Sequence, residues 1–376
     1  MIFNARRFKR PVLIFGWGVH LAGAARQAVE LAERSNIPAA LTWGAIDLFP
    51  DDHPLRIGGF GTHGARAPNF SVQNADFILA VGTRLDSKST GTPVDSFARA
   101  AYIVMVDIDA KEIARHSERV EGCVMDAAEF LKGAIIEAPD TTAWLARIAQ
   151  WKMDYPLSDE PAYQAVRALS QSLVKGDIIV SDTGHALAWM MQAFAFKKGQ
   201  RFIHAFNNTP MGYGLPAAIG ASFANPGRRI VLVTGDGGLQ VNVQELATVA
   251  KHKLPIHIIL FNNHGHGMCR QTQDQWLEGH HYSTSPDGGL PDPDFKAVAR
   301  AYGIRVLPDG TYPGATFGTN TDEHTGPTFM QVEIPFDAKL ATQVRFGRAN
   351  EDADPLLPRE ELRSQMMIPL YGDSDG

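Results

Sequence analysis

The sequence is poor in cysteine, in long apolar runs and in excess charge of one sign. Two cysteines, Cys123 and Cys269, are too few for a disulfide framework, which favours a reducing compartment such as the cytoplasm. No apolar run reaches the roughly 20 residues that a membrane span needs, so we expect no membrane protein. Lysine and arginine total 35 against 41 acidic residues, and no long basic run predicts binding to nucleic acid.

The composition is that of a soluble globular protein. Of 376 residues, 44% are hydrophobic and 20% are charged, a balance that excludes intrinsic disorder. The length corresponds to roughly two domains of about 150 residues each plus a tail. The basic residues 1–10 and the apolar residues 11–25 superficially resemble a signal peptide. His20 interrupts that apolar stretch, however, and residues 12–15 are better interpreted as a buried strand.

Short apolar runs alternate with helical stretches in the first part of the chain. We expect a helix at residues 24–35 and strands at residues 12–15, 39–43, 77–82 and 102–109. Uniformly apolar strands separated by helices are typical of a parallel sheet covered on both faces. We assign residues 1–140 to this first domain and interpret residues 139–157 as a linker.

A second α/β pattern begins near Ala162. Helices are expected at residues 162–174, 185–194, 215–224, 240–252 and 294–303, and strands at residues 177–182, 229–234, 256–263 and 328–334. We assign residues 155–335 to this second domain and residues 336–376, which are rich in proline and charge, to an irregular tail. The predicted fold is therefore α/β, with two doubly wound parallel-sheet domains joined by right-handed crossovers.

The clearest chemical signal is a glycine-rich turn after a predicted strand. Residues 229–234 lead directly into Gly235-Asp236-Gly237-Gly238, and a helix is expected immediately afterwards. Such a turn offers backbone N–H groups and a helix N-terminus to an anion. Asp236 would repel a phosphate unless a cation lay between them, and Mg²⁺ bridges carboxylates and phosphates in this way. The turn therefore predicts a phosphate and magnesium site, with an ordinary tight turn as the alternative.

An asparagine pair strengthens this interpretation. Asn263 follows Asp236 by 27 positions, the length of one helix and one strand. A single crossover therefore places both residues at the carboxyl ends of parallel strands, where α/β sheets bind ligands. We expect Asp236, Asn263 and the carbonyl of Gly265 to supply oxygen ligands to the metal, with diphosphate and water completing the shell.

The GDG turn, 24 further residues and then Asn262-Asn263 resemble the shared motif of thiamine-diphosphate-dependent enzymes. Over residues 10–335 the chain is similar to acetolactate synthase large subunits, most clearly in segments 10–24, 58–86, 207–221 and 235–273. The resemblance implies that the first domain is the family's middle domain and that the second binds the cofactor diphosphate. Thiamine diphosphate and Mg²⁺ are the cofactors that it implies.

The resemblance also assigns roles to individual residues. Met211 matches the bulky residue that bends the cofactor into a V shape, which places an internal base beside the reacting carbon. Without the other motifs, Met211 would be interpreted as a core methionine. Backbone groups of Thr209 and Met211 would hold the aminopyrimidine. The expected cofactor-binding residues are Gly184, His185, Thr209, Met211, Gly235, Asp236, Gly237, Gly238, Asn263, Gly265, His266, Gly267 and Met268.

Two histidines follow the metal asparagine. We expect His264 and His266 to face the cofactor and, with Met211, to form the catalytic group. An imidazole at position 266, where relatives often have tyrosine, would move protons during decarboxylation or acceptor addition. A loop histidine bonded to backbone is the alternative. With His280 and His281 these residues do not match the spacing of a zinc site.

One domain of the family has no counterpart in the sequence. The pyrimidine-binding domain supplies the glutamate that activates the cofactor, and no residue of this chain can be assigned that role. We therefore predict that a separate pyrimidine-domain subunit carries the glutamate, in a hetero-oligomer such as α₂β₂. A fragment without activity is the alternative.

The first domain carries a weaker set of ligand signals. Gly16-Trp17-Gly18 opens its first turn, but Leu21 replaces the third glycine of a dinucleotide fingerprint, which argues against NAD. Acetolactate synthases bind FAD near the matches to Gly61-Thr62-His63-Gly64 and Arg84. Where that family continues with an acid and an arginine, this chain has Ser87 and Lys88, so an FAD site and an empty site both remain open.

The expected function is decarboxylation of a 2-keto acid, with pyruvate as donor, and acyl transfer to a carbonyl acceptor. The tryptophan that shapes acceptor choice in acetolactate synthases is absent near Thr272, and residues 355–370 resemble relatives from sugar biosynthesis that extend ketosugars. A 2-hydroxyacyl-CoA lyase or oxalyl-CoA decarboxylase relative is one alternative. The other is a non-catalytic cofactor-binding or scaffold subunit, which would not require Asp236 and Asn263.

Overall fold

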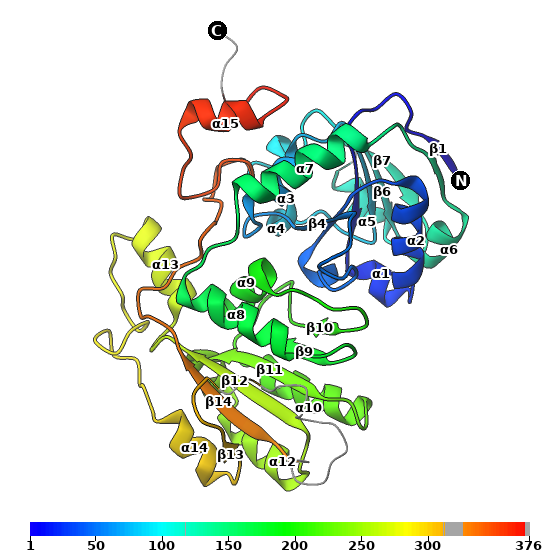
Figure 1. Cartoon of the computed structure of the whole chain (residues 1–376). Helices are drawn as coiled ribbons and strands as arrows, with labels where there is room; N and C mark the ends of the chain where they lie inside the picture. Colours follow the sequence, from blue (N-terminus) through cyan, green and yellow to red (C-terminus); the bar gives the residue numbers. More distant parts are fainter. Residues whose placement is uncertain (117, 311, 313–325, 373–376) are drawn as a thin grey trace. The chain divides into compact units, whose positions relative to one another are not determined.

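Each apolar run that predicts a strand forms one, and these strands belong to two parallel six-stranded sheets (Figure 1). The computed structural model describes residues 1–116, 118–310, 312 and 326–372. The chain divides into two units. The first unit comprises Met1–Leu157 together with the described residues from Ala341 onward, and the second comprises Ser158–Leu340.

The first unit is built on a sheet with the strand order β4-β3-β2-β5-β6-β7. Its strands are β2 (Pro11–Phe15), β3 (Ala39–Leu41), β4 (Arg56–Gly59), β5 (Phe77–Val81), β6 (Tyr102–Asp107) and β7 (Val120–Val124). Its helices are α1 (Trp17–Leu21), α2 (Ala25–Ser35), α3 (Arg66–Gln73), α4 (Ser87–Thr90), α5 (Ala110–Ala114), α6 (Ala127–Gly133) and α7 (Thr142–Asp154). The short strands β1 (Ile2–Asn4) and β8 (Ile135–Glu137) pair in parallel beside this sheet.

The second unit has the strand order β10-β9-β11-β12-β14-β13. Its strands are β9 (Ile178–Ser181), β10 (Arg201–Ile203), β11 (Ile230–Gly235), β12 (Ile256–Asn262), β13 (Arg305–Val306) and β14 (Thr328–Glu333). Its helices are α8 (Pro161–Ser172), α9 (Gly184–Ala193), α10 (Gly214–Ala224), α11 (Asp236–Val241), α12 (Leu246–Lys251), α13 (Gly267–Trp276) and α14 (Phe295–Ala301).

Both sheets are doubly wound, which confirms the predicted fold class. All strand pairs within each sheet are parallel, and helices lie on both faces (Figure 1). The direction of winding reverses between β2 and β5 in the first unit and between β9 and β11 in the second. In open α/β sheets such a switch point leaves a crevice at the carboxyl ends of the strands, where ligands bind.

The interpretation of residues 139–157 as a linker is wrong. These residues contain α7, whose Trp144, Ile148 and Trp151 are buried in the core of the first unit. The spacing of four and then three residues places these side chains on one face of a helix. The Trp144 ring also donates a hydrogen bond from Nε1 to the carbonyl of Pro11, 3.1 Å away, which ties α7 to the first strand of the sheet.

The tail after the second unit returns to the first unit and contains one helix that the sequence did not predict, α15 (Arg359–Gln365). Its Leu362 joins the apolar core of the first unit, and so does Leu370. Polar contacts reinforce this packing, because Asn74 donates to the carbonyl of Gln365 at 3.1 Å and accepts from the N–H of Met367 at 2.6 Å. The first unit is therefore discontinuous in sequence, with the second unit inserted into it.

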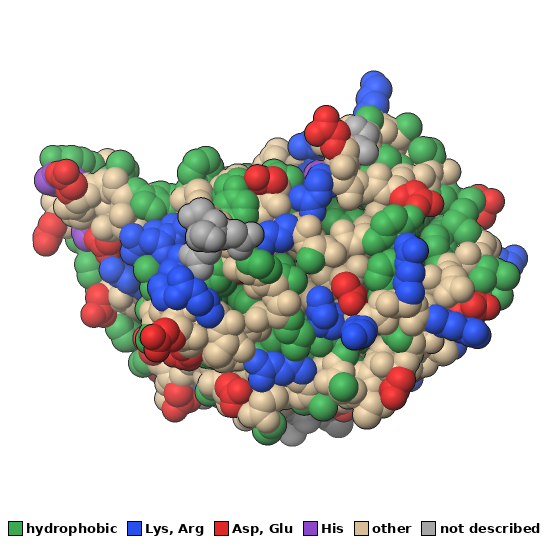
Figure 2. Space-filling view, turned by 90° about the horizontal axis from the view of Figure 1, so that it is seen from above, with side chains coloured by type: hydrophobic (Ala, Val, Ile, Leu, Met, Phe, Trp, Pro, Cys, Tyr) green, Lys and Arg blue, Asp and Glu red, His purple; other side chains and the backbone are tan. Residues whose placement is uncertain are grey.

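The surface carries charges of both signs. On the face shown in Figure 2, basic and acidic side chains are interspersed among apolar ones.

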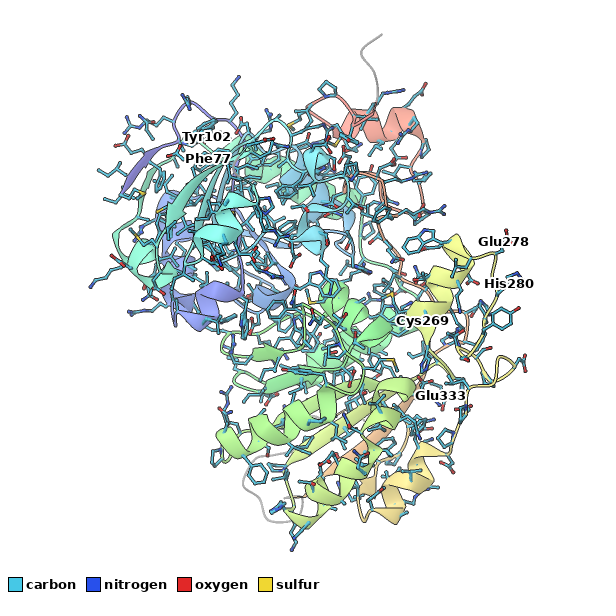
Figure 3. All side chains as sticks on the ribbon, turned by 180° about the vertical axis from the view of Figure 1, so that it is seen from behind. Phe77, Tyr102, Cys269, Glu278, His280 and Glu333 are labelled. Carbon is cyan, nitrogen blue, oxygen red and sulfur yellow. The ribbon has the colours of Figure 1, made fainter. Side chains whose placement is uncertain are left out.

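Two aromatic residues of the first unit, Phe77 on β5 and Tyr102 on β6, lie next to each other with ring centroids 6.4 Å apart (Figure 3). Within the part of the chain that the structure describes, no helix is both long enough and apolar enough to cross a membrane.

Candidate cofactor site

A cavity of about 260 Å³ lies at the switch point of the second unit. The turn after β9 and the turn after β11 form two of its walls, and the loop after β12 forms a third. The residues that the sequence assigns to cofactor binding all line this cavity: Gly184, His185, Thr209, Met211, Gly235, Asp236, Gly237, Gly238, Asn263, Gly265, His266, Gly267 and Met268. The remaining lining residues are Thr183, Ala186, Trp189, Phe261 and Cys269. Cys269 lies on α13, outside the apolar core (Figure 3).

The Asp236 carboxylate occupies the floor of the cavity and is 7% exposed. One oxygen accepts the N–H of Gly237 and the other accepts the N–H of Gly265, each at 2.6 Å. Since β11 and β12 are parallel neighbours, this second bond confirms that the crossover brings the two loops together. Burial raises the pKa of Asp236 despite these two donors, and a bound cation would favour its charged form.

The amide of Asn263 tests whether the residues fit a metal. One of its polar atoms lies 2.9 Å from the carbonyl oxygen of Gly265, and the other lies 3.2 Å from Nη2 of Arg270. With its nitrogen toward Gly265 the amide is hydrogen-bonded at both ends. With its oxygen toward Gly265, two acceptors lie side by side, an arrangement that a cation stabilises.

The spacing of these atoms matches an octahedral ion. Adjacent oxygen ligands at about 2.0–2.1 Å from Mg²⁺ lie about 2.9 Å apart. With the amide oxygen of Asn263 turned toward Gly265, that oxygen and the carbonyl of Gly265 would satisfy this condition, and Asp236 contacts the same loop through the N–H of Gly265. The donor set contains only oxygen, as Mg²⁺ requires, so the residues fit the ion.

Arg270 holds the metal loop from behind. Its guanidinium is 4% exposed and donates to the carbonyls of Asn263 at 3.2 Å and His264 at 3.4 Å. It also donates to the carbonyl of Phe336 at 2.5 Å and lies 3.7 Å above the centre of the Phe336 ring. A Cβ at Gly265 would lie 2.4 Å from the backbone carbonyl oxygen of Thr284 and 2.6 Å from Nη1 of Arg270. The loop therefore requires glycine at this position.

Met211 and His266 both approach Gly237, in the turn after β11. A Cβ on Gly237 would lie 2.4 Å from Nδ1 of His266 and 2.9 Å from Cε of Met211. Met211 is 38% exposed and extends along the cavity wall. Thr209, in the same loop, has a left-handed backbone with φ of 46°, which is strained for a β-branched residue. Its N–H donates to the carbonyl of Ala205, so its own carbonyl is the group that it can offer a ligand.

His185 anchors the turn after β9. It is 5% exposed, its Nε2 lies 2.8 Å from Oε1 of Gln271, and its ring lies 4.8 Å from that of Trp189. Gly184, which starts α9, has φ of 78° and open space where a side chain would lie. The turn can therefore bring its backbone close to a ligand without steric hindrance.

The expectation that His264 faces the cofactor is wrong. Its Nδ1 lies 2.7 Å from a carboxylate oxygen of Asp292, and its Nε2 lies 3.1 Å from Glu333 at the end of β14 (Figure 3). His264 has a left-handed backbone with φ of 54°, which turns its side chain away from the direction of its neighbours. The two carboxylates raise its pKa against the opposing effect of burial.

The other histidines of this region do not gather around a metal. His281 pairs with Asp274 at 2.7 Å, and His280 lies 3.9 Å from Glu278 (Figure 3). The two acids at His264 occupy opposite sides of its ring, so they do not share one ion with it. Over the described residues there is no cluster of three His, Cys, Asp or Glu side chains that could hold a metal.

The candidate FAD residues of the first unit are engaged with other parts of the protein. Arg84 lies 3.5 Å from Asp86 and 3.9 Å from Glu112, and these two carboxylates neutralise its charge. The loop at residues 61–64 contacts the returning tail, because the N–H of Val344 donates to the carbonyl of Thr62 at 2.8 Å. This arrangement does not favour an FAD diphosphate at Arg84.

Asp182 is a buried acid beside the cavity that sequence reasoning missed. It follows β9 and precedes the turn at Gly184, which is the position that Asp236 holds after β11. A carboxylate between an apolar strand and a glycine turn is the signal that would have identified it. Its carboxylate accepts hydrogen bonds from two segments near the cavity, at Thr183 and at Gly212 and Gly214.

Comparisons with known proteins agree with this geometry. Residues 182–332 match the model of the thiamine pyrophosphate enzyme C-terminal TPP-binding domain, and residues 6–133 match the thiamine pyrophosphate enzyme central domain. Thiamine pyrophosphate is another name for thiamine diphosphate, and these domains imply this cofactor together with Mg²⁺.

Individual relatives are acetolactate synthase large subunits. The chain is 31% identical over 354 residues to the acetolactate synthase isozyme 1 large subunit of Escherichia coli, covering 92% of this chain and 62% of the relative. A probable acetolactate synthase large subunit of Methanocaldococcus jannaschii is 34% identical over 315 residues, covering 79% of this chain and 53% of the relative. The large subunit of Parasynechococcus marenigrum is 34% identical over 372 residues, covering 96% of this chain and 57% of the relative.

The chain thus spans between 53% and 62% of the length of these three relatives. The chain therefore belongs to the thiamine pyrophosphate enzymes, and it contains the central and the C-terminal TPP-binding domains of that family.

Proposed function

We propose that this chain is the diphosphate-binding subunit of a split, acetolactate synthase-like enzyme. In this proposal the enzyme decarboxylates a 2-keto acid, with pyruvate as donor, and transfers the acyl group to a carbonyl acceptor. The observation that carries the proposal is that every residue assigned to the cofactor from the sequence lines one cavity at a switch point. The absence of a disulfide, since both cysteines are free thiols, supports a cytoplasmic enzyme.

The chain's own residues would bind and orient the cofactor. Asp236, Asn263 and the carbonyl of Gly265 would hold Mg²⁺, and the ion would screen the diphosphate from the Asp236 carboxylate. Thr209 and Met211 would position the aminopyrimidine, and the apolar Met211 side chain would keep water from the reacting carbon. When bound, thiamine diphosphate supplies the nucleophilic carbon that attacks the 2-keto group.

His266 would hold a proton near that carbon. Its ring lines the cavity and lies next to Gly237, so it reaches the space above the diphosphate turn. An imidazole there can donate or accept a proton as the acceptor carbonyl is added. His264 takes no part in this proposal, because Asp292 and Glu333 hold its ring outside the cavity.

A second polypeptide would complete the site. Among the described residues that line the cavity, Asp236 is the only acid, and both of its oxygens already accept hydrogen bonds from the metal loop and turn. In this proposal the activating glutamate comes from a separate pyrimidine-domain subunit in a hetero-oligomer such as α₂β₂.

Two measurements test the proposal. The first is isothermal titration of the purified chain with thiamine diphosphate at saturating Mg²⁺, where we expect binding that EDTA abolishes. The second is CO₂ release from pyruvate with and without a separately expressed pyrimidine-domain polypeptide, where we expect turnover only in the mixture.

Each outcome has a distinct meaning. Full turnover by the chain alone would rule out the split arrangement, and failure to bind the cofactor would rule out the function itself. Cofactor binding without turnover of pyruvate or any other 2-keto acid in the mixture would favour a scaffold subunit. Cleavage of oxalyl-CoA or a 2-hydroxyacyl-CoA in place of pyruvate would favour the acyl-CoA enzymes.

A further inference from the structure

We propose that Asp182 is a positioning residue that sets the loop carrying Thr209 and Met211 against the diphosphate turn. The inference rests on the proposed function of the cavity and concerns a residue that does not itself line it. Asp182 follows β9 at the switch point, and its side chain is almost completely buried, with 1% exposed. A buried carboxylate is retained only where it accepts several hydrogen bonds.

The Asp182 carboxylate accepts three backbone N–H groups. One oxygen accepts from Thr183 at 2.7 Å and from Gly212 at 3.1 Å. The other accepts from Gly214 at 2.8 Å. Gly212 and Gly214 follow Met211 directly, so two of these bonds fix the backbone on the C-terminal side of that residue. The third bond fixes the start of the turn that contains Gly184.

The same carboxylate also supports the diphosphate turn. A Cβ on Gly238 would lie 2.9 Å from Cγ of Asp182, and a Cβ on Gly214 would lie 2.9 Å from its Oδ2. Both glycines are therefore required because Asp182 packs against their backbone. Three segments of the cavity wall, at residues 183–184, 212–214 and 238, thus meet on one side chain.

The peptide of Gly212 is held from both sides. Its N–H donates to Asp182, and its carbonyl accepts from Nδ2 of Asn242 at 2.7 Å. Gly212 has φ of 83°, which glycine adopts readily, but Thr209 nearby has φ of 46°, a conformation that a β-branched residue rarely adopts. Asp182 and Asn242 are the contacts that keep the loop in this form, with Met211 directed along the cavity.

A carboxylate suits this position better than an amide. Each of its oxygens accepts N–H donors, whereas asparagine would turn an NH₂ group toward one of them and leave two donors facing each other. The substitution Asp182→Asn therefore changes almost no volume but releases either Gly212 or Gly214. Since Asp182 touches neither the cavity nor the metal ligands, the loss would act through the Met211 loop.

The experiment compares two ligands of the chain. Asp182→Asn is titrated with thiamine diphosphate and, separately, with inorganic pyrophosphate, both at saturating Mg²⁺. We expect the variant to bind thiamine diphosphate about tenfold or more weakly, because the residues for the aminopyrimidine are displaced. We expect its affinity for pyrophosphate to stay within about twofold of the wild type, because Asp236 and Asn263 keep their places.

A matched control lies at the other end of the same strand. Asp177 is also buried, with 3% exposed, and pairs with Arg229 through Nε at 3.0 Å. Asp177→Asn should lower the melting temperature without changing the affinity for either ligand. If both aspartate variants weaken thiamine diphosphate in proportion to their loss of stability, Asp182 has only a structural role and the proposal is wrong.

A second variant keeps the test decisive if Asp182→Asn does not fold. Asn242 is partly exposed, so Asn242→Ala should fold and should release the carbonyl of Gly212. We expect it to weaken thiamine diphosphate more than pyrophosphate, in the same direction as Asp182→Asn. If this variant lost affinity for both ligands by the same factor relative to the wild type, the proposal would be overturned. Failure of the wild-type chain to bind either ligand would instead contradict the proposed function.

Discussion

The two switch points of this molecule have the same topology, but the turns at one open into a cavity and the turns at the other pack against each other. In the second unit, the turns after β9 and β11 open into the cavity. A Cβ on Gly184 would have no atom within 4 Å, and the atom nearest to a Cβ on Gly235 is the carbonyl oxygen of Phe261 at 4.0 Å. In the first unit, the turns after β2 and β5 close on each other. A Cβ on Gly16 would lie 2.3 Å from the carbonyl oxygen of Gly82, and the N–H of Gly18 donates to that same oxygen at 2.9 Å.

The comparison shows that glycine at a strand-to-helix turn has two different uses. It allows the backbone to approach a ligand, or it allows two loops to pack directly on each other. The carboxylates differ in the same way. Asp236 bonds the metal loop across the cavity, whereas Asp86 caps α4 by accepting the N–H groups of Lys88 and Ser89. Topology gives both units a crevice, and the local contacts decide whether it stays open.

The largest effect that we expect is a difference in cofactor binding between variants of Asp236 and Asp86. Asp236→Ala should weaken binding of thiamine diphosphate with Mg²⁺ by more than about 100-fold, because it removes a metal ligand and the bond to Gly265. Asp86→Ala should leave that affinity unchanged and cost about 1 kcal/mol of stability, since it removes a helix cap. Titration calorimetry measures the first effect and urea unfolding the second. Equal losses of affinity would erase the distinction between the two turns.

The glycines should separate in the opposite sense. Gly16→Ala inserts a methyl group into a backbone contact and should cost about 1–3 kcal/mol of folding free energy without weakening the cofactor. Gly184→Ala has space but a positive φ, so we expect a cost of about 1 kcal/mol. This second variant should also bind thiamine diphosphate more weakly, because the turn changes its backbone. Unfolding curves and titrations of both variants measure these effects. If the first crevice were the ligand site, Gly16→Ala would weaken cofactor binding and Gly184→Ala would not.

We expect both units to lose folding stability at low pH. The two units should differ least in this property. Burial, with the charge of Lys88, lowers the pKa of His63 in the first unit to about 4, and burial near Arg229 lowers that of His257 in the second unit to about 4. Both rings are neutral in the folded state and gain protons on unfolding below about pH 6.5. Stability contributed by each is therefore full above that pH and is lost as the pH falls toward 4.

Single variants assign this loss to one unit. His63→Gln and His257→Gln should each remove about 1–3 kcal/mol of the difference in unfolding free energy between pH 7 and pH 4. Urea unfolding at the two pH values measures it. A pH dependence that stays unchanged in both variants would show that neither ring is held neutral by its surroundings.

The parts of the fold that the sequence predicts are those with one dominant physical cause. Strand β5 is buried along its whole length and has no polar residue, and β12 is also buried throughout, with His257 and Asn262 as its only polar residues. Strand β7 was missed because it is an edge strand with mostly exposed residues, and β4 because half of it is glycine. Helix α7 was missed although its buried Trp144, Ile148 and Trp151 have the spacing of one helix face, which is the signal that predicts it.

The site divides along the same lines. Asp236 and Asn263 are predictable because one crossover fixes their separation in space. His264 is not, because a left-handed backbone at that residue reverses the direction that its neighbours suggest. Asp182 gains its role only when the Met211 loop folds back onto β9, across 30 residues of sequence, and a single sequence gives no sign of that contact.

The insertion of the second unit into the first has a consequence for how the protein is made. A ribosome releases α3 and α7 early, but the residues that cover them, around Leu362 and Leu370, leave the exit tunnel only after the whole second unit. The first unit must therefore wait with part of its apolar core uncovered, while the second can close as soon as it is synthesised. Stop codons or fusions placed near residue 360 should for this reason damage the domain farthest away in sequence, and the nascent chain should depend on chaperones in proportion to that delay.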